Sequence, residues 1–411
     1  MVSGGYDDTY QPLQRESGFY QFQQGLWTNY NSAGTSDAIT TPAIRDLTSA
    51  AYDPLTGTTY LVSFGEGILL RDSEGAFSLI NNTSMQTPFF GNITVALTDV
   101  VVDLAGNAWF TQYEPSSGGA PLHLFTAQGW QSFPSINSAT NRPLELLIDL
   151  NAYKWIRLEP SFTAGGLWVI DETNTRNKYL NSTIGNLNNE RVLSMVQDKE
   201  GTIWLGTEDG VMVVFDSFNV FNEGFQVTIP TFEGRPLLRN EAVKCIAVDG
   251  GNRKWMGTEN GVFLFDEEAT QLIAHFTTDN SPLLSNNLLD IVIQGGTGEV
   301  FFCTDQGIIS YRADATEASD SFGDVRIFPN PVRPDFDGMV AIEGLAQNAD
   351  IRITDISGKL IFRTTANGGT ATWNIRDYNG NRAATGVYLV FATNQSGEEA
   401  TVGKIAVVSN E

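Results

Sequence analysis

Hydrophobic positions in the first three quarters of the chain come in short alternating runs, and the pattern recurs about every 50 residues. Two clear copies are residues 192–216 (VLSMVQDKEGTIWLGTEDGVMVVFD) and 243–266 (VKCIAVDGGNRKWMGTENGVFLFD). Each has an apolar run, a tight turn, a run that carries an aromatic residue, a glycine-containing loop and another alternating run. Runs with a period of two that end at Gly, Asn or Asp predict short β-strands joined as hairpins.

The aromatic residue of the second run marks six copies of this repeat. The six positions are Tyr60, Trp109, Trp155, Trp204, Trp255 and Phe301. They are separated by 49, 46, 49, 51 and 46 residues. A unit of this length with about four short strands has the size of one propeller blade. The sequence therefore predicts an all-β fold whose main domain, residues 1–312, is a β-propeller of six or seven blades.

The first 35 residues contain only part of the repeat. GFYQFQQGLWTNYNSAG, beginning at Gly18, resembles the outer part of a blade without its inner strands. One interpretation is that the strand near 27–30 completes the sixth blade, which reaches Arg312 without an outer strand; sharing a blade between the two ends removes open sheet edges. The other interpretation is that residues 1–35 are a partial blade left by a missing upstream propeller.

An aspartate lies six residues before the aromatic residue in four of the repeats. These residues are Asp103, Asp149, Asp198 and Asp249. Their recurrence favours a structural role, because an Asp carboxylate can accept backbone N–H groups within a turn. We therefore assign these carboxylates to the turns and not to catalysis or metal binding.

A second domain is predicted after Arg312, where the repeat stops. Residues 313–323 (ADATEASDSFG) are small, polar and acidic, which is typical of a linker. Residues 324–411 contain about seven short alternating runs, which predict a small Ig-like β-sandwich. Trp373 and Tyr388 are assigned to the core of this sandwich.

The charge of the chain argues against nucleic-acid binding. Its 24 Lys and Arg residues against 48 Asp and Glu give a formal net charge of −24. Residues 324–411 hold 8 basic and 10 acidic residues, so nearly all of the excess negative charge lies in the propeller. Such a field repels nucleic acid and anionic membranes.

The inventory of reactive side chains predicts that the protein binds no cofactor and no metal ion. It also predicts that the protein is not an enzyme. Cys245 and Cys303 are the only cysteines, and His123 and His275 the only histidines, which leaves little for a disulfide framework, a zinc site or a histidine-based triad. No apolar run is long enough to span a membrane, so no transmembrane segment is expected. The start of the chain, MVSGGYDDTYQ, does not resemble a signal peptide.

The blades resemble the two-component-regulator propeller repeat, most clearly at 192–216 and 243–266. The tail resembles the C-terminal sorting domain of the type IX secretion system of Bacteroidetes. Three motifs in order carry this likeness: FPNP at 328–331, ISGK at 356–359 and GVYLV at 386–390. A propeller of this type followed directly by such a tail is similar to the PorZ-like family, accessory proteins of the cell-surface attachment complex.

The resemblance to this family implies that the protein itself catalyses no reaction. It implies two propellers, a retained sorting domain and assistance to the sortase that joins cargo to anionic lipopolysaccharide. The expected partners are then the sortase, the outer-membrane proteins of the system and anionic lipopolysaccharide, at the outer membrane on the cell surface. The alternative is a secreted surface protein whose propeller binds a glycan or a protein and whose tail is a cleavable export signal.

Candidate binding residues lie in the long loops of one propeller face. These are the loops 113–121 and 158–166 and the crossing segment 230–240, and such loops are where scaffolds usually place recognition. The candidates for a ligand contact are Tyr113, Glu114, Glu159, Phe162, Phe232 and Arg235. The alternative is that these loops have no ligand.

In the tail, alternation predicts a basic patch for an anionic saccharide. Ile351 and Ile353 are expected to point inward, and Arg352 and Thr354 outward. The next run is expected to place Lys359 and Arg363 on one face and Leu360 on the other. The patch would consist of Arg352, Lys359, Arg363 and Arg376 and act through charge-assisted hydrogen bonds. The alternative is that these are ordinary solvated surface charges.

Overall fold

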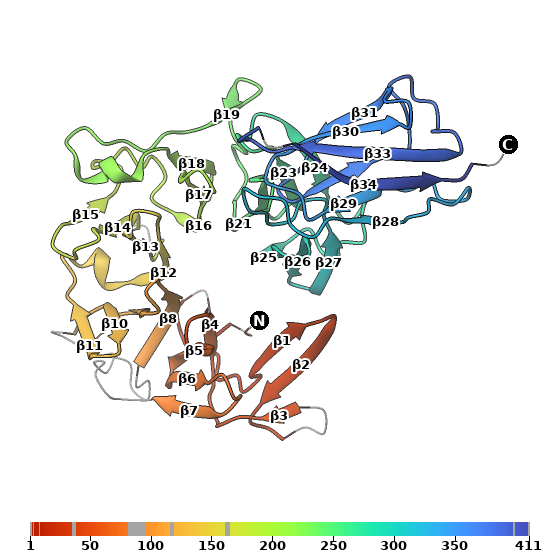
Figure 1. The fold of residues 1–411 in the computed structure, drawn as a ribbon. Coiled ribbons are helices and arrows are strands. Elements are labelled where there is room, and N and C mark those ends of the chain that lie inside the picture. Colours follow the sequence, from red (N-terminus) through yellow and green to blue (C-terminus); the bar gives the residue numbers. More distant parts are fainter. Residues whose placement is uncertain are drawn as a thin grey trace. The chain divides into compact units, whose positions relative to one another are not determined.

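The computed structural model describes residues 2, 4–7, 9–34, 38–80, 95–115, 119–160, 165–397 and 399–409, with only the backbone of residues 399–402. Regular structure in these ranges is almost entirely strand, from β1 to β34, with two short 3-10 turns (Figure 1). Two compact units are formed. The first comprises residues 1–197, 201–207 and 213–228, and the second comprises 198–200, 208–212 and 229–411. No helix in the described ranges is long and apolar enough to cross a membrane.

The strands of each of the six predicted repeats pair antiparallel in sequence order, and the first two repeats are joined in one eight-stranded sheet by the pairing of Phe64 with Ala96. The first three repeats have four strands each: β4 (Leu47–Asp53), β5 (Thr58–Gly65), β6 (Gly67–Arg71) and β7 (Phe77–Ile80); β8 (Val95–Val102), β9 (Ala108–Gln112), β10 (Leu122–Thr126) and β11 (Gly129–Phe133); and β12 (Pro143–Ile148), β13 (Lys154–Leu158), β14 (Leu167–Ile170) and β15 (Asn177–Leu180). The fourth consists of β16 (Val192–Gln197), β17 (Ile203–Thr207) and β18 (Gly210–Val214).

The second unit holds the last two repeats. The fifth has four strands and the sixth has three: β21 (Cys245–Val248), β22 (Lys254–Gly257), β23 (Val262–Phe265) and β24 (Leu272–Phe276); and β25 (Leu288–Gln294), β26 (Glu299–Thr304) and β27 (Gly307–Arg312). A small hairpin, β19 (Thr231–Phe232) and β20 (Arg235–Pro236), precedes them. The prediction of an all-β propeller is confirmed.

The aspartate before each aromatic residue fixes both the turn and the tryptophan. Oδ1 of Asp103 accepts the backbone N–H groups of Ala105 and Asn107, and Oδ2 accepts the indole N–H of Trp109 at 3.1 Å. The pairs that repeat this geometry are Asp149 with Trp155 (3.0 Å) and Asp249 with Trp255 (2.9 Å). The six-residue spacing is therefore the length of chain that returns an indole to the turn carboxylate. In these three repeats the structural assignment is correct.

The turns also explain two departures from the repeat. Ala152 and Asn252 stand where other repeats have glycine, and both have a φ of +59°. Glycine is favoured there because this left-handed conformation costs it nothing. Asn tolerates the conformation better than Ala does, so the third repeat carries the more strained turn.

The first strands of the chain form a separate sheet. β1 (Phe19–Gln23), β2 (Leu26–Asn31) and β3 (Ala38–Thr40) pair with β2 in the middle, and Phe19 and Tyr30 pack on Leu61 and Leu69 of the first repeat. Both edges of β2 are therefore occupied. This sheet belongs to the first unit, whereas the sixth repeat belongs to the second.

The tail is a β-sandwich of seven strands, as the alternating runs predict. One sheet contains β28 (Arg326–Phe328), β29 (Val340–Glu343) and β32 (Thr370–Trp373). The other has the order β31 (Leu360–Thr365), β30 (Asp350–Asp355), β33 (Gly386–Thr393) and β34 (Glu399–Val407).

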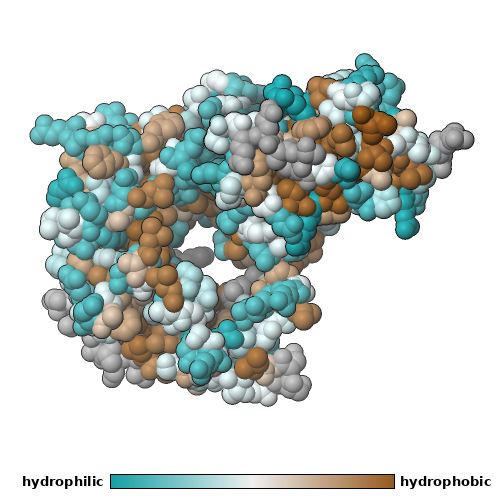
Figure 2. Space-filling model, in the orientation of Figure 1, coloured by the Kyte–Doolittle hydropathy of each residue, from teal (hydrophilic) through white to brown (hydrophobic). Residues whose placement is uncertain are grey.

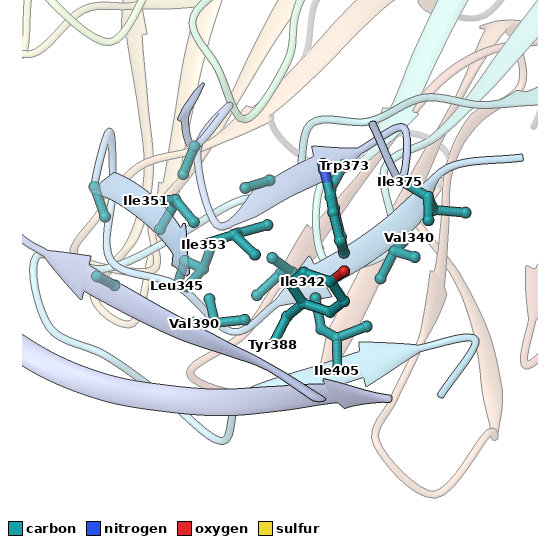
Figure 3. Close-up of a cluster of buried hydrophobic side chains, with 14 of the residues drawn as sticks. Val340, Ile342, Leu345, Ile351, Ile353, Trp373, Ile375, Tyr388, Val390 and Ile405 are labelled. Carbon is teal, nitrogen blue, oxygen red and sulfur yellow. The ribbon is translucent and has the colours of Figure 1, made fainter. Parts of the chain in front are cut away.

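Trp373 and Tyr388 lie in the sandwich core, with ring centroids 5.3 Å apart (Figure 3). The polar atom of each ring is satisfied within the domain: the Trp373 indole donates to the carbonyl of Arg376 and the Tyr388 hydroxyl to that of Ala384, both at 2.9 Å. Their assignment to the core is correct, and neither is a platform for a sugar.

Candidate functional site

Three of the predicted propeller residues meet around Arg142, which the sequence analysis did not single out. The Tyr113 hydroxyl donates to Oε2 of Glu159 at 2.7 Å, and Nη1 of Arg142 donates to the same oxygen at 3.1 Å. Nε of Arg142 lies 2.5 Å from Oε1 of Glu114. These loop residues therefore bind one another, which holds the two loops together.

Tyr113 is covered by the N-terminal segment. Its side chain is only 4% exposed and stacks on Tyr10 at 5.1 Å between centroids, while Phe64 packs against it at 5.9 Å. Burial, together with the hydrogen bond to Glu159, raises the pKa of Tyr113 well above its ordinary value. Tyr113 is thus a neutral core residue in this structure and not an exposed contact.

The other propeller candidates lie elsewhere. Phe162 is outside the described residues. Phe232 and Arg235 face each other across the β19–β20 hairpin of the second unit, whose two-residue turn has positive φ at both positions. Phe232 packs edge-on against Phe265 at 5.3 Å, whereas Arg235 is exposed. This hairpin presents two exposed charged side chains, Glu233 and Arg235, and anchors itself through Phe232.

In the sorting-type domain the predicted basic patch forms only in part. Arg352 and Arg363 are cross-strand partners, and both bind Asp350: Arg352 Nη2 at 2.8 Å and Arg363 Nε at 2.6 Å. Hydrogen bonds from Arg363 and Arg352 hold the pKa of Asp350 below its usual value. Two guanidinium groups and one carboxylate thus form a cluster with a net positive charge.

Lys359 and Arg376 lie apart from this cluster. Lys359 is exposed in the turn after β30, where its backbone N–H donates to Oδ1 of Asp355 at 3.1 Å. Arg376 is exposed in the loop after β32 and donates through Nη1 to the carbonyl of Gly380 at 2.7 Å. The structure therefore brings together two of the four predicted residues.

The expected alternation fails at the end of β30. Thr354 was expected outward but is 8% exposed, although it pairs with Leu389 of β33 without a register shift. The register with β31 shifts because Ile361 is an extra residue between the pairs Ile353–Phe362 and Thr354–Leu360. β31 begins only at Leu360, which is 41% exposed where an inward position was expected. A bulge adds a residue to one strand and reverses the facing of those that follow, and sequence alternation alone does not reveal it.

The outer face of the same sheet also carries apolar side chains that the sequence analysis passed over. Val387 is 43% exposed, and Leu389 and Phe391 are half-buried on the same side of β33. Phe391 is paired with Arg352, and Leu389 with the exposed Lys404 of β34. Hydrophobic residues are visible over this sheet in Figure 2. The alternation of GVYLVFAT was the available signal, since it places these three residues opposite the buried Tyr388 and Val390.

The segment between the sixth repeat and the sandwich is packed and hydrogen-bonded. Arg253, in the turn of the fifth repeat, is 8% exposed; its Nε lies 2.8 Å from Oδ2 of Asp249 and its Nη1 2.8 Å from Oδ1 of Asp314. Asn367 of the sandwich donates to Oδ2 of Asp314 at 3.2 Å. One carboxylate of this segment therefore joins a propeller repeat to the sorting-type domain.

Three pairs of adjacent glycines surround this segment. A Cβ atom on Gly250 or on Gly368 would lie 2.0 Å from the carbonyl oxygen of Thr316, and one on Gly295 would lie 2.2 Å from the side chain of Glu317. The hydroxyls of Thr316 and Thr370 are hydrogen-bonded at 2.8 Å in a buried position. The turns at 250–251 and 367–370 thus contact the backbone of residues 313–318 at distances that a side chain would forbid, and Gly295 packs on the side chain of Glu317. We call this arrangement the glycine clamp.

Both cysteines and His123 lie in environments that favour their neutral forms. Burial raises the pKa of the Cys245 thiol well above its ordinary value and that of the Cys303 thiol to about 11, so both thiols are protonated. His123 is fully buried between Ser132 and Gln112, and burial lowers its pKa to about 4. Within the ranges that the structure describes, no three His, Cys, Asp or Glu side chains are grouped to hold a metal ion.

Comparison with known proteins agrees with both parts of the architecture. A model described as a secretion system C-terminal sorting domain matches residues 326–408, and one described as a two component regulator propeller matches residues 186–209. No curated protein matches the chain significantly. The C-terminal sandwich is therefore a secretion-system sorting domain.

Two solved structures share the fold. PorZ of Porphyromonas gingivalis, described as an essential bacterial surface component of the type IX secretion system, is 23% identical with a TM-score of 0.66 over 93% of this chain and 54% of that one. The extracellular domain of a putative one-component system of B. thetaiotaomicron is 13% identical with a TM-score of 0.51 over 99% and 55%. The chain thus has a PorZ-like fold and spans about half the length of each of these two chains.

Proposed function

We propose that this PorZ-like, secretion-system-associated chain is a non-enzymatic component of the type IX cell-surface attachment complex, located at the outer membrane. In this role it keeps its sorting domain, binds anionic lipopolysaccharide and assists the sortase that processes cargo. The observation that carries the proposal is the glycine clamp. If the tail is a cleavable signal, the peptide that precedes it must be accessible to a processing enzyme. Packing of residues 313–318 in the glycine clamp reduces this accessibility.

The backbone in front of the sorting domain is hydrogen-bonded along its length. Ala313 N–H donates to the carbonyl of Gly298, and the carbonyl of Thr316 accepts from Gly369, both at 2.9 Å. Further along, the Ser319 carbonyl accepts from Gln347 at 2.9 Å and the Gly323 N–H donates to Gly344 at 2.9 Å. A protease needs an extended peptide with free backbone groups, so these bonds must open before cleavage.

Opening the clamp has a substantial energetic cost. It separates Arg253 from Asp314 and leaves a nearly buried guanidinium with one carboxylate partner instead of two. Asp314 is 45% exposed, so losing its ion pair with Arg253 costs less than the about 3–5 kcal/mol of a fully buried pair, and losing the buried Thr316–Thr370 hydrogen bond costs about 1 kcal/mol more. Since each 1.4 kcal/mol is about tenfold in population, the open form would be rare.

The outer face of the β31–β30–β33–β34 sheet supports the lipopolysaccharide part of the proposal. Arg352, Arg363 and Lys404 lie there beside the apolar Leu389 and Phe391. Guanidinium groups bind phosphate and carboxylate with paired hydrogen bonds. The propeller is strongly acidic and would repel an anionic polymer, so the sorting domain is the part suited to it.

The test of this binding uses the full chain and two purified lipopolysaccharides, one anionic and one neutral. We expect at least tenfold tighter binding to the anionic form than to the neutral form, and a loss of at least tenfold in affinity for the anionic form in the double variant Arg352→Ala, Arg363→Ala. Arg326→Ala is the matched control, because Arg326 lies on the other sheet and is 74% exposed. Equal loss in the control, or binding that the double variant retains, would contradict the assignment of this face.

A second candidate function is the secreted surface protein with a cleavable tail. It is favoured by the exposure of Ser319, Asp320, Ser321, Gly323 and Asp324, whose side chains are accessible although the backbone is bonded. In this case the propeller would bind a glycan or protein, and the exposed Arg235 of the β19–β20 hairpin remains a candidate contact. The two functions predict different masses for the mature protein, because the sorting domain is kept in the first and removed in the second.

A further inference from the structure

The fourth repeat departs from the others after β18. It has no regular outer strand in the described chain; instead, a 3-10 turn, η2 (Ser217–Phe221), is followed by an irregular segment that pairs only once, at Val213 with Thr228. This segment is rich in phenylalanine, and Phe215 and Phe218 are 64% and 66% exposed.

A cleft of about 350 Å³ lies beside this segment, within the first unit. The loop 182–186, after β15, forms one side and residues 222–226 form the other, with Lys178 of β15 between them. The volume falls in the range of small-molecule sites. Phe225 and Ile184 contribute apolar surface, and the remaining lining is mostly amide and hydroxyl groups.

The two loops that form the cleft are held by their own backbone. Oδ1 of Asn181 accepts the N–H groups of Thr183 and Ile184 at 2.9 and 2.7 Å, and Val227 N–H donates to the carbonyl of Gly185 at 2.7 Å. Neither 182–186 nor 222–226 contains a strand, so neither loop offers the strand edge with which a peptide ligand usually pairs. The side chains of the lining therefore decide which ligand fits.

The amide groups of Asn186 and Gln226 line the cleft and make no hydrogen bond to any other residue that the structure describes. Each amide carries a donor and an acceptor in one plane, and Ser182 and Thr183 add hydroxyls of both kinds. A hydroxyl-rich ligand can use all of these groups. These amide and hydroxyl side chains are uncharged, so they would select a ligand by its shape and its hydrogen-bonding pattern and not by its charge.

The charged groups of the cleft are unsuited to an anion. Nζ of Lys178 donates to the carbonyls of Val220 and Asn222 at 2.7 and 3.2 Å, and burial lowers its pKa. Glu223 is a lining carboxylate and offsets the positive charge. The ammonium group also lies over the ring of Phe225, 5.4 Å from its centroid, and is therefore engaged within the protein.

We propose that this cleft binds a neutral saccharide. A sugar ring has an apolar C–H face, which fits Phe225 and Ile184, and a rim of hydroxyls that donate and accept, which fits Asn186, Gln226 and the two hydroxyl side chains. The site is distinct from the basic face of the sorting domain and goes beyond the proposed function. It stands or falls independently of lipopolysaccharide binding.

The test uses the full-length chain on an array of neutral bacterial-surface oligosaccharides and their acidic counterparts, followed by calorimetry with the best neutral binder. We expect a neutral saccharide to bind, Phe225→Ala to weaken it at least tenfold and Gln226→Ala to weaken it about fivefold, as for one lost hydrogen bond. Phe218→Ala is the matched control and should stay within twofold, since Phe218 does not line the cleft.

Gln226 is exposed, so its variant tests the site even if Phe225→Ala unfolds the segment. Binding to acidic glycans alone, binding to no glycan, or unchanged binding by Gln226→Ala would each overturn the proposal. Thermal unfolding of each variant, compared with the parent chain, separates a lost ligand contact from a lost fold.

Discussion

The guanidinium of Arg253 lies 2.8 Å from the carboxylate of Asp314 and thereby joins the fifth propeller repeat to the segment that leads into the sorting domain. The same guanidinium is bound by Asp249, which also accepts the indole N–H of Trp255. The turn aspartate that organises the repeat therefore positions the residue that holds the tail. The fifth repeat and the sorting domain share one hydrogen-bonded network.

Removing the arginine should loosen the tail. In Arg253→Met the buried Asp249 loses its ion pair and Asp314 loses its anchor, so we expect a destabilisation of about 2–4 kcal/mol and faster proteolysis within 313–323. Urea unfolding and mass-spectrometric mapping of the first cleavage sites measure both effects.

The matched control is Arg312→Met. Arg312 also joins the sixth repeat to the sandwich, through Glu343 at 3.2 Å, but it is 56% exposed and should cost less than about 1 kcal/mol. Equal effects of the two substitutions would contradict the role given to Arg253.

Adding one methyl group to the glycine clamp should also destabilise the protein and expose residues 313–323 to proteolysis. In Gly250→Ala the new Cβ would lie 2.0 Å from the carbonyl oxygen of Thr316, so the segment must move. We expect earlier proteolysis at 313–323 and a loss of about 1–3 kcal/mol. Gly296→Ala is the control, because no atom lies within 4 Å of the point that its new Cβ would occupy and the change should be neutral. Resistance of Gly250→Ala to proteolysis equal to that of the control would show that the close contact is not needed.

The hydrogen bond between turn aspartate and tryptophan can be isolated by comparing two buried tryptophans of the third repeat. Trp155 donates to Asp149 at 3.0 Å, whereas the buried indole nitrogen of Trp168 has no hydrogen-bond partner among the residues that the structure describes. Both side chains are at most 1% exposed, so Trp→Phe removes similar volume at each.

Trp155→Phe should therefore be more destabilising than Trp168→Phe by about 1–3 kcal/mol, the cost of leaving a buried carboxylate oxygen without its donor. Thermal or urea unfolding of both variants gives the difference. If Trp168→Phe proves the more costly, the indole bond is not what stabilises this turn.

Asp99 should make stability depend on pH. Its carboxyl accepts hydrogen bonds from Ser49 at 2.6 Å and from the N–H of Leu146 at 2.8 Å, yet burial raises its pKa to about 6. A raised carboxyl pKa means that the folded state binds the proton more tightly than the unfolded state. Stability from this group is therefore present below about pH 4 and is lost as the pH rises through 6.

Asp99→Asn should remove that dependence and be more stable than the parent chain at pH 7 by up to about 3 kcal/mol. His123, with its lowered pKa, acts in the opposite direction between pH 4 and 6.5, but it is present in both proteins and cancels in the comparison. A difference between the two chains that does not change with pH would contradict this account of Asp99.

The sequence was most informative where one interaction recurs. The aspartate–tryptophan spacing is visible because three described repeats use the same carboxylate for the same turn and indole, and the six aromatic positions located every repeat. Alternation likewise identified all seven strands of the sandwich and the inward side of Tyr388 and Trp373.

Prediction from the sequence was weaker where a single register shift or a single contact decides the position of a side chain. The bulge at Ile361 reverses the facing of Leu360, and the late start of β31 moves Lys359 into a turn, so the predicted basic patch is split. Tyr113, in a long loop, is covered by Tyr10, a contact between residues about 100 positions apart in the chain. No periodic signal predicts such a contact.

The composition of 313–323 suggested a linker because small polar residues are typical of mobile connections. The same small residues also allow close backbone packing, and the available signal was the three glycine pairs at 250–251, 295–296 and 368–369. A small-residue segment flanked by matching glycine pairs is better interpreted as a packed junction.

The measurement that tests the central claim most directly is the intact mass of the protein isolated from the bacterial surface, with sequencing of its C-terminal peptides. The account predicts that residues 326–408 remain attached, with peptides that extend through the 313–323 segment uncut. A mature protein that ends within 313–324 and carries an added glycolipid mass would contradict it and identify the chain as exported cargo.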